Sequence, residues 1–234
     1  MQEKVKTAFV LGAGLGTRLR PLTEQCPKPL LPMGGRPIVT YAFDHLKQLG
    51  IERIIVNTHH CAEKYQEIFP DNQWNGIPLV FVHEPILLET GGGIKNIVPY
   101  LQNETLLVYN GDILADFDLR SLLDYHFSHQ EEVTLALRSK DYPQHIGLDA
   151  LGRVAAIRAA KGKPIVQWCL FTGIYLIAPR FLDRLKTGEK KSVIPAFEMM
   201  IEEGKGPAGV ICDQGRWCDV GSLQTYHAMK ERGW

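Results

Sequence analysis

Several features of common protein classes are missing from this sequence. No apolar run approaches the roughly 18 residues that a membrane span needs, and Met1 is followed by Gln-Glu-Lys rather than by a leader that is first charged and then apolar. The five cysteines are odd in number and lack C-x-x-C spacing, so we expect free thiols. Lysine plus arginine (26) equals aspartate plus glutamate (26), which gives no bulk attraction to nucleic acid or to an anionic membrane. We therefore expect a cytoplasmic protein with small-molecule partners.

The length and composition fit one folded domain. At 234 residues and 45% hydrophobic, the chain can bury a full core without disulfides or metals. Short apolar runs alternate with segments of helical period through the first half, which is the pattern of β-α-β units on a parallel sheet. After about Val133 the pattern becomes more antiparallel. We expect a single α/β domain over residues 1–234, with halves over residues 1–130 and 131–234 on one continuous sheet.

The periodicities predict the individual elements. Strands are expected at residues 8–11, 54–56, 79–82, 106–109, 133–137 and 170–177, with a hairpin over 147–157 that turns at 149–152. One helix is expected after Pro37, with Gly50 as its C-terminal cap, and a second after Thr90. A third is expected after an N-cap at Asp116 or Asp118. A helix over residues 192–203 and a last strand and helix within 217–232 complete the chain.

A glycine-rich turn follows the first strand, in the segment LGAGLGTRLRPL over residues 11–22. Glycines let the backbone approach a ligand and point N–H groups at phosphate oxygens, and basic residues outnumber acidic ones through Arg36, so an anionic ligand suits this end. The dinucleotide-binding fingerprint does not fit, because Thr17 stands at its last glycine position and prolines interrupt the helix that should follow. The second strand also ends in Asn57-Thr58, without the carboxylate that binds a ribose. A nicotinamide or flavin enzyme is disfavoured.

Lysine 28 stands between two prolines in the segment PKPLLPMGGRP. Proline fixes φ and disfavours helix in the residue before it, so Pro27 and Pro29 are expected to hold Lys28 in an extended chain. A lysine fixed in this way can meet a phosphate, whereas a solvated lysine in a surface turn is the alternative.

Two aspartates stand where ligands of parallel sheets bind. Asp112 follows the strand over residues 106–109 in the sequence Asn-Gly-Asp, and Asp219 lies in the sequence Trp-Cys-Asp-Val-Gly. Either one alone could be a turn or capping residue. Together with a phosphate-binding loop they predict a Mg²⁺ site, because Mg²⁺ favours one or two carboxylates plus phosphate oxygens and water.

Two further segments contain residue types that can bind ligands. Residues 84–94, EPILLETGGGI, end in three glycines at a helix N-terminus, where free N–H groups and the missing side chains leave room for a flat ring. His126 and His129 lie three apart on an expected helix, but they have no nearby carboxylate or cysteine to complete a metal site. We expect both histidines to be exposed.

These residues carry a family resemblance. Residues 12–23 followed by 27–32 resemble the signature of the sugar-phosphate nucleotidyltransferases, G-x-G-T-R-L-x-P-L-T and P-K-P-L-L-P. The resemblance implies a three-layer αβα, Rossmann-like nucleotidyltransferase fold with a mixed, mostly parallel sheet, a nucleotide-binding half over residues 1–130 and a sugar-phosphate-binding half over 131–234. It implies catalytic roles for Arg18, Lys28 and Asp112, and Mg²⁺ on Asp112 and Asp219. The nucleotide-binding residues implied are Leu11, Gly12, Ala13, Gly14, Gly16, Thr17, Glu89, Thr90 and Gly91.

One branch of the family is matched more closely. The blocks L-E-T-G-G-G-I and F-T-G-I-Y resemble the N-acetylmuramate 1-phosphate uridylyltransferases of cell-wall recycling, which implies UTP as the triphosphate, with GTP next. Lys163-Pro164 is similar to the E-K-P motif that holds the sugar phosphate in relatives, although Gly162 replaces its glutamate. By this resemblance Lys163, Gly147 and Thr172 are expected to contact the sugar phosphate.

Other functions remain open at this point. They are a mannose or heptose 1-phosphate guanylyltransferase, a CTP:phosphocholine-type cytidylyltransferase, and a non-catalytic sensor of a nucleotide sugar. An aromatic cage would favour phosphocholine, but no aromatic cluster is evident. The chain stops soon after its last expected helix, without the hexapeptide-repeat domain of bifunctional acetylating relatives, so no second activity is expected. The sequence leaves open whether the chain forms a homo-oligomer.

Overall fold

The computed structural model describes residues 5–141, 143–159 and 163–234, which form a mixed ten-stranded sheet covered by helices. β1 (Thr7–Leu11) lies between β7 (Leu106–Asn110) and β4 (Arg53–Thr58), and the three strands are parallel. β6 (Ile77–His83) continues the parallel set, and β5 (Gln73–Trp74) closes that edge as an antiparallel strand. The parallel half lies where the sequence predicted it.

The second half of the chain extends the same sheet. β12 (Gln167–Ile177) is antiparallel to β7 on one side and to β9 (Val133–Arg138) on the other. β13 (Ala208–Ile211) runs parallel to β9. β10 (Ile146–Leu148) and β11 (Val154–Ile157) form the expected hairpin, and β10 also pairs with β12. The prediction of a more antiparallel second half is confirmed.

One predicted strand lies outside the main sheet. β14 (Trp217–Asp219) pairs with β8 (Ile113–Ala115) in a separate two-stranded antiparallel sheet. The two halves do share one continuous ten-stranded sheet, as expected, but this last strand is not part of it. Because β7 is already paired on both sides, the chain that continues beyond it needs a new partner for its backbone groups, and β14 supplies it.

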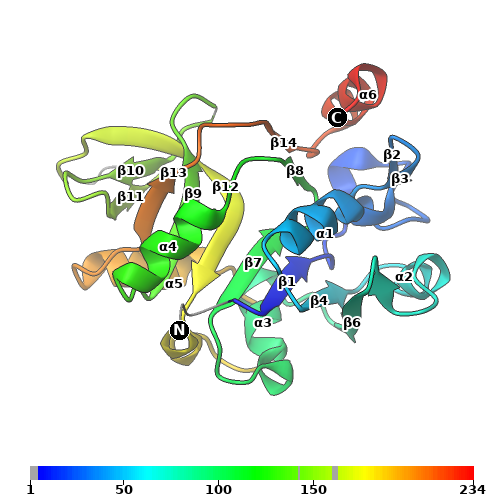
Figure 1. The fold of residues 1–234 in the computed structure, drawn as a ribbon, viewed down its shortest axis with the longest axis horizontal. Coiled ribbons are helices and arrows are strands. Elements are labelled where there is room, and N and C mark those ends of the chain that lie inside the picture. Colours follow the sequence, from blue (N-terminus) through cyan, green and yellow to red (C-terminus); the bar gives the residue numbers. More distant parts are fainter. Residues whose placement is uncertain (1–4, 142, 160–162) are drawn as a thin grey trace.

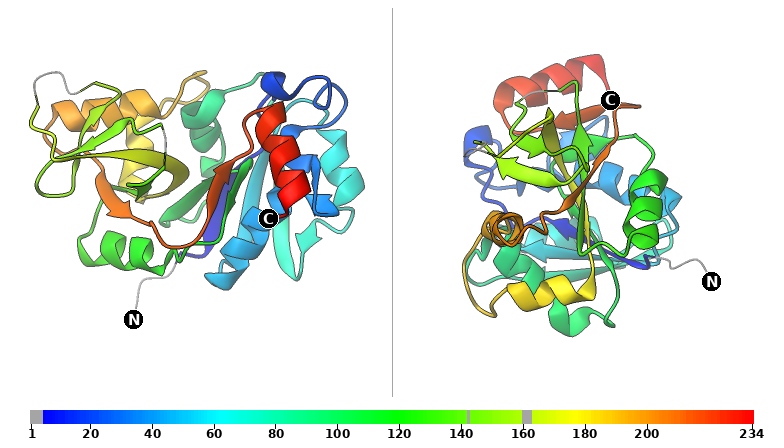
Figure 2. Two further views of the ribbon diagram at one scale, coloured as in Figure 1. Left: turned by 90° about the horizontal axis from the view of Figure 1, so that it is seen from above. Right: turned by 90° about the vertical axis from the view of Figure 1, so that its left-hand side faces the viewer.

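Helices cover both faces of the sheet, which gives the expected three layers (Figures 1 and 2). α1 (Val39–Gln48) and α4 (Arg120–Ser128) lie on one face. α3 (Glu89–Asn96) and α5 (Ile194–Glu202) lie on the other. The remaining elements are α2 (Glu63–Ile68), α6 (Leu223–Arg232), β2 (Pro32–Met33), β3 (Arg36–Pro37) and the 3₁₀ helices η1 (Thr17–Leu19), η2 (Lys28–Leu30), η3 (Val98–Tyr100) and η4 (Pro179–Arg184).

The alternation of side chains along each strand divides the core in two. Val10 of β1 packs in one cluster with Phe43 of α1 and Leu122 of α4. Its neighbour Phe9 points to the other face and joins Ile94 of α3. A strand buried on both faces reads as a continuous apolar run, which is why these strands were visible in the sequence.

The helix ends agree only in part with the capping predictions. Gly50, after α1, has a φ of 76°, as expected for a left-handed C-terminal cap. Neither aspartate proposed for α4 is its N-cap; that position is Leu119, which makes no side-chain cap. Asp118 Oδ1 instead accepts the N–H of Arg120 at 2.9 Å, which satisfies one backbone donor of the first turn.

His126 is buried rather than exposed, so that prediction is wrong. It lies one turn after Leu122 on the face of α4 that packs on the sheet, and it is 2% exposed. Its Nδ1 lies 2.9 Å from Thr134 Oγ1. Burial, with a smaller contribution from the nearby charge of Arg180, lowers the pKa of His126 to about 4.

The buried histidine predicts acid sensitivity. The pKa of His126 is about 4 in the folded chain against 6.5 as the ordinary value, so the unfolded chain binds the extra proton first. The free energy of unfolding is therefore not reduced by this histidine above pH 6.5. It falls as the pH drops toward 4, by about 3 kcal/mol at most. Urea unfolding at pH 7 and at pH 4.5 should show a smaller loss for His126→Gln than for the wild type. The exposed His129→Gln serves as the control; an unchanged pH slope in His126→Gln would contradict this role.

None of the helices in the described residues is both long and apolar enough to cross a membrane. All five cysteines are free, as predicted.

Candidate active site

Two acids far apart in the chain face the same lysine. Asp112 follows β7, and Asp219 is the last residue of β14. Asp219 lies opposite Ile113 in the β8–β14 ladder, and the N–H of Val220 donates to the carbonyl of Asp112 at 3.1 Å, so the two acids become neighbours. Lys28 Nζ forms an ion pair with Asp112 Oδ2 and lies 3.7 Å from Asp219 Oδ1. The small sheet outside the main one thus assembles this end of the site.

Lys28 reaches the acids from a short 3₁₀ turn. The turn η2 is closed by the N–H of Leu30, which donates to the carbonyl of Pro27 at 2.9 Å. The extended backbone predicted for Lys28 is therefore wrong, because Pro29 falls in the first turn, where its missing N–H costs nothing. The lysine side chain is only 9% exposed, and its ammonium is directed at the two carboxylates.

Arg18 approaches the same acids from η1. A Cβ placed on Gly221 would lie 3.1 Å from Arg18 Nη2 and 3.1 Å from Asp219 Oδ1, so the guanidinium and the carboxylate meet at this glycine. Gly16, at the start of η1, has a φ of 60°, which lets the loop turn back. The cations of the two early motifs and the two acids therefore lie together.

The two acids of this cluster are the residues that could hold a divalent cation. Burial raises the pKa of Asp219, and the neighbouring charge of Asp112 raises it further, whereas Lys28 and Arg18 act in the opposite direction. Among the described residues, no group of three or more histidine, cysteine or acidic side chains could hold a metal by itself. A pair of carboxylates open to solvent suits Mg²⁺, which takes its remaining ligands from phosphate and water.

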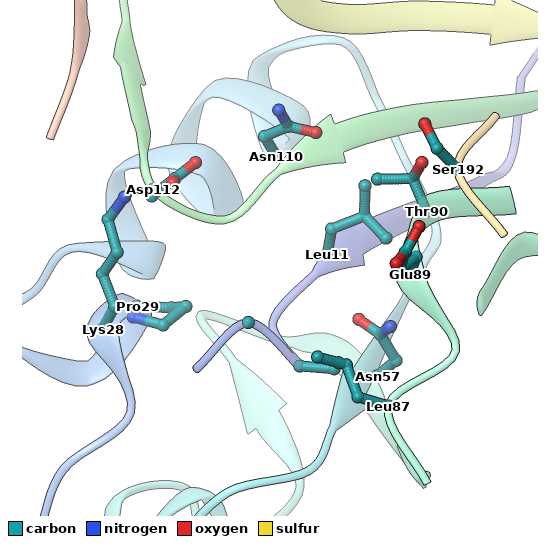
Figure 3. A pocket seen from close by; sticks show the side chains of 12 residues that line it. Leu11, Lys28, Pro29, Asn57, Leu87, Glu89, Thr90, Asn110, Asp112 and Ser192 are labelled. Carbon is teal, nitrogen blue, oxygen red and sulfur yellow. Dashed lines mark hydrogen bonds and ion pairs between the residues drawn. The ribbon is translucent and has the colours of Figure 1, made fainter. Parts of the chain in front are cut away.

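A cavity of about 390 Å³ extends from Lys28 and Asp112 along the ends of β1, β4 and β7 (Figure 3). Lys28 and Asp112 line one end, and Glu89, Thr90 and Ser192 line the other (Figure 3). The carboxyl ends of parallel strands are where ligands of open α/β sheets bind. The other lining residues are Leu11, Ala13, Gly14, Pro29, Asn57, Leu87 and Asn110.

Comparison with known proteins agrees with this architecture. The nucleotidyl transferase family profile matches residues 7–232. The chain belongs to the nucleotidyl transferase family. The chain is 34% identical, over 94% of its length, to a mannose-1-phosphate guanylyltransferase of Mycobacterium tuberculosis, but it spans only 62% of that protein. It is 29% identical to the N-acetylmuramate alpha-1-phosphate uridylyltransferase of Neisseria meningitidis serogroup B, over 92% of this chain and 93% of the relative.

Solved structures share the fold of this nucleotidyl transferase. HddC from Yersinia pseudotuberculosis, complexed with GMP-PN, superposes with a TM-score of 0.78 at 19% identity, over 97% of this chain and 99% of that one. A UDP-glucose pyrophosphorylase complexed with UDP-glucose has a TM-score of 0.79 at 17% identity, over 97% and 98% of the two chains. The predicted family and the predicted Rossmann-like fold are confirmed.

The glycine-rich loop of this nucleotidyl transferase is built for close approach. A Cβ on Gly12 would lie 2.6 Å from Tyr65 Oη and 2.7 Å from the carbonyl of Asn57, so protein packing requires this glycine. A Cβ on Gly14 would meet nothing within 4 Å, so the space beside it is open to the cavity that Gly14 lines. Thr17 is exposed in η1 and does not line the cavity.

The far end of the cavity is formed by the start of α3. Glu89 has a φ of 61°, a conformation that is strained for a residue with a side chain and that often marks a binding site. Thr90 Oγ1 accepts the N–H of Val193 at 2.8 Å, which fixes α3 against the loop before α5. The N–H groups expected to be free are not, because Gly91 and Gly92 donate theirs to the carbonyl of Lys191 at 2.8 and 3.0 Å. Glu89 and Thr90 line the cavity, and Gly91 lies behind them.

A buried polar chain, which no sequence motif indicated, joins the glycine-rich loop to the segment before α3. The N–H of Gly12 donates to Asn57 Oδ1 at 2.8 Å, and Asn57 Nδ2 donates to Glu84 Oε1 at 2.7 Å. Glu84 Oε2 accepts the N–H of Leu88 at 3.0 Å. Glu84 is fully buried, and Asn57 is 2% exposed. The only signal in the sequence was position, since Asn57 lies near the end of β4 and Glu84 directly follows β6.

This chain predicts a specific effect of Glu84→Gln. A glutamine amide can accept only one of the two N–H groups that the carboxylate accepts, so one buried donor is left facing another. We expect a loss of about 1–3 kcal/mol in the free energy of unfolding and weaker triphosphate binding, because the loops at Gly12 and Leu88 lose their common anchor. Urea unfolding and titration with a nucleotide measure the two effects. The exposed Glu63→Gln is the control, and wild-type values for Glu84→Gln would remove the anchor role.

The three residues expected to contact the sugar phosphate lie outside the cavity lining. Lys163 Nζ donates to the carbonyl of Ile201 at 2.9 Å. Gly147 lies in β10, where a Cβ would be 2.9 Å from Ile165 Cδ1. Thr172 is buried, and its Oγ1 donates to the carbonyl of Ala136 at 2.7 Å. Gly162, which replaces the motif glutamate beside Lys163, lies outside the described residues.

Proposed function

We propose that the protein is a sugar-1-phosphate nucleotidyltransferase, which converts a nucleoside triphosphate and a sugar 1-phosphate into a nucleoside diphosphate sugar and pyrophosphate. The observation that carries the proposal is the convergence of Lys28 on Asp112 and Asp219 at one end of the cavity. The relatives named above act on sugar 1-phosphates or bind nucleotide sugars according to their names. One cavity joins a cationic end at Lys28 to an end lined by Glu89 and Thr90. This arrangement suits a triphosphate and its base.

The reaction needs no covalent intermediate on the protein. A phosphate oxygen of the sugar 1-phosphate attacks the α-phosphorus, a new P–O bond forms, and the bond to the bridging oxygen of the β-phosphate breaks, so pyrophosphate leaves. Lys28 and Arg18 offset the negative charge that develops on the α-phosphate and on the leaving group. The buried chain from Gly12 to Glu84 keeps the phosphate loop and the far end of the cavity at a fixed separation.

Asp112 and Asp219 would hold Mg²⁺, which supplies electrostatic stabilisation of the phosphate oxygens when it is bound. The donor set fits this ion, because two carboxylates lie together beside open space. In the structure the ammonium of Lys28 neutralises both acids. We infer that a bound triphosphate draws Lys28 toward its own oxygens and leaves the acids to the metal.

We propose UTP with N-acetylmuramate 1-phosphate, or a related sugar, as the substrate pair. The blocks around Glu89 and Gly173 support this pair, as does the near-full overlap with the Neisseria meningitidis uridylyltransferase. GTP with mannose 1-phosphate is the second candidate, because the Mycobacterium tuberculosis guanylyltransferase has the higher identity, 34%. Free cysteines suit the cytoplasm as the compartment.

A substrate matrix tests the proposal. ATP, CTP, GTP, UTP and dTTP are each combined with a panel of sugar 1-phosphates and with phosphocholine in Mg²⁺, and pyrophosphate release is measured. We expect signal with UTP or GTP and an aldose 1-phosphate. Activity only with CTP and phosphocholine would transfer the protein to the cytidylyltransferases. Binding of nucleotide sugars without any turnover would make it a sensor.

A further inference from the structure

A second cavity, of about 530 Å³, lies at the end of the sheet opposite the active site. Residues 103–105, which line it, precede β7, whereas Asn110 and Asp112 of the active site follow that strand. A strand of five residues spans about 17 Å, so the two cavities are separate. The end of α4 and the turn after β12 complete the lining, through residues 126–127, 130–131 and 178–180. The volume is in the range of small-molecule sites.

The second cavity contains an imidazole nitrogen that lacks a partner. His126 is 2% exposed, and its Nδ1 is engaged with Thr134 Oγ1. Its Nε2 makes no hydrogen bond in the described part of the chain. Tyr175 Oη is the one described side-chain atom that lacks a partner and is fully enclosed, so His126 Nε2 is not fully enclosed. The Nε2 of His126 is therefore reached from the cavity that the residue lines. A polar atom of a nearly buried side chain that faces a cavity without a protein partner can hydrogen-bond a ligand there.

The balance of charges around the second cavity favours an anion. Both carboxylate oxygens of Glu131 are bound by Arg153, at 2.8 and 3.0 Å. Glu104 Oε1 accepts from Thr7 at 2.9 Å and pairs with Arg53 at 3.3 Å. Arg180 differs, because its guanidinium donates only to the carbonyl of Gln130 and pairs with no carboxylate in the described part of the chain. Its charge also lies close enough to His126 to act on that ring.

We propose that this second cavity binds a small organic or phosphate anion, with its acid group paired to Arg180 and hydrogen-bonded to His126 Nε2. The neutral imidazole can donate to the anion from Nε2 when Nδ1 accepts from the hydroxyl of Thr134. A charge-assisted bond to Arg180 supplies most of the affinity. The site is independent of the proposed catalytic function, and an anion bound in the active site would not contact His126.

Histidine-ring ¹H–¹⁵N spectra test the site directly. The protein is titrated with inorganic phosphate and, separately, with malonate, each at constant ionic strength set with KCl, at pH 7. The signal of His126 is identified by its absence from His126→Gln. We expect a saturable shift of the Nε2 resonance with at least one of the two anions. Stronger binding of phosphate would indicate a phosphate ester as the natural ligand, and stronger binding of malonate would indicate a carboxylate.

Matched arginine variants decide the outcome. Arg180→Gln changes an exposed residue and should weaken the anion at least about tenfold. Arg120→Gln, at the exposed start of α4, the helix that carries His126, removes a charge outside the cavity and should leave the affinity unchanged. The absence of a shift with both anions would overturn the proposal. An equal affinity in Arg180→Gln and the wild type would overturn it as well.

Discussion

Asp112→Asn should lower kcat by about 100- to 1000-fold in Mg²⁺. The amide keeps the size of the side chain but removes the charge that pairs with Lys28 and would bind the metal. Asp219 lies 3.7 Å from Lys28 and cannot replace the lost charge. A single carboxylate would then have to neutralise both the lysine and the metal ion. Steady-state pyrophosphate release as a function of Mg²⁺ concentration measures the effect.

The control for Asp112→Asn is Asp118→Asn. Asp118 is an exposed acid in the segment after β8, and it pairs with Arg120 rather than with the cluster. It should leave kcat unchanged. Wild-type turnover by Asp112→Asn would remove the metal from the proposed mechanism.

Lys28→Met should have two opposite effects. Turnover should fall by about 100- to 1000-fold, because the α-phosphate and the leaving group lose a fixed cation. The affinity for Mn²⁺, used as a probe in the absence of nucleotide, should rise, because Asp112 and Asp219 lose the ammonium that now neutralises them. Methionine retains an unbranched stem of similar length in a side chain that is 9% exposed, so folding should persist.

Pyrophosphate release and a Mn²⁺ titration followed by electron paramagnetic resonance separate the two effects of Lys28→Met. Lys64→Met, which removes a partly exposed lysine paired with Glu67, is the control and should change neither quantity. Weaker Mn²⁺ binding in Lys28→Met would show that the lysine supports the metal site rather than competing with it. Unchanged turnover would remove Lys28 from catalysis.

Several residues predicted on the early loop line the cavity, whereas Lys163, Gly147 and Thr172 of the second half do not. The glycine-rich turn and Lys28 lie in one short segment, so their proximity follows from the chain itself. Lys163 and Thr172 depend on how β10, β12 and α5 pack, and they bind backbone carbonyls of Ile201 and Ala136 instead of lining the cavity. Spacing in the sequence carries no information about such contacts.

The sequence by itself determined the family, the alternation of strands and helices, and the types of charged residue at the site, because these follow from local backbone preference and from motifs of contiguous residues. The tertiary structure alone decided that β14 pairs with β8 and so brings Asp219 to Asp112, that Asn57 and Glu84 join in a buried chain, and that His126 is enclosed. The physical reason is common to all three. Burial, ion pairing and hydrogen bonding depend on which distant segments pack together. The type and position of a residue in the sequence do not reveal which distant residue it will contact.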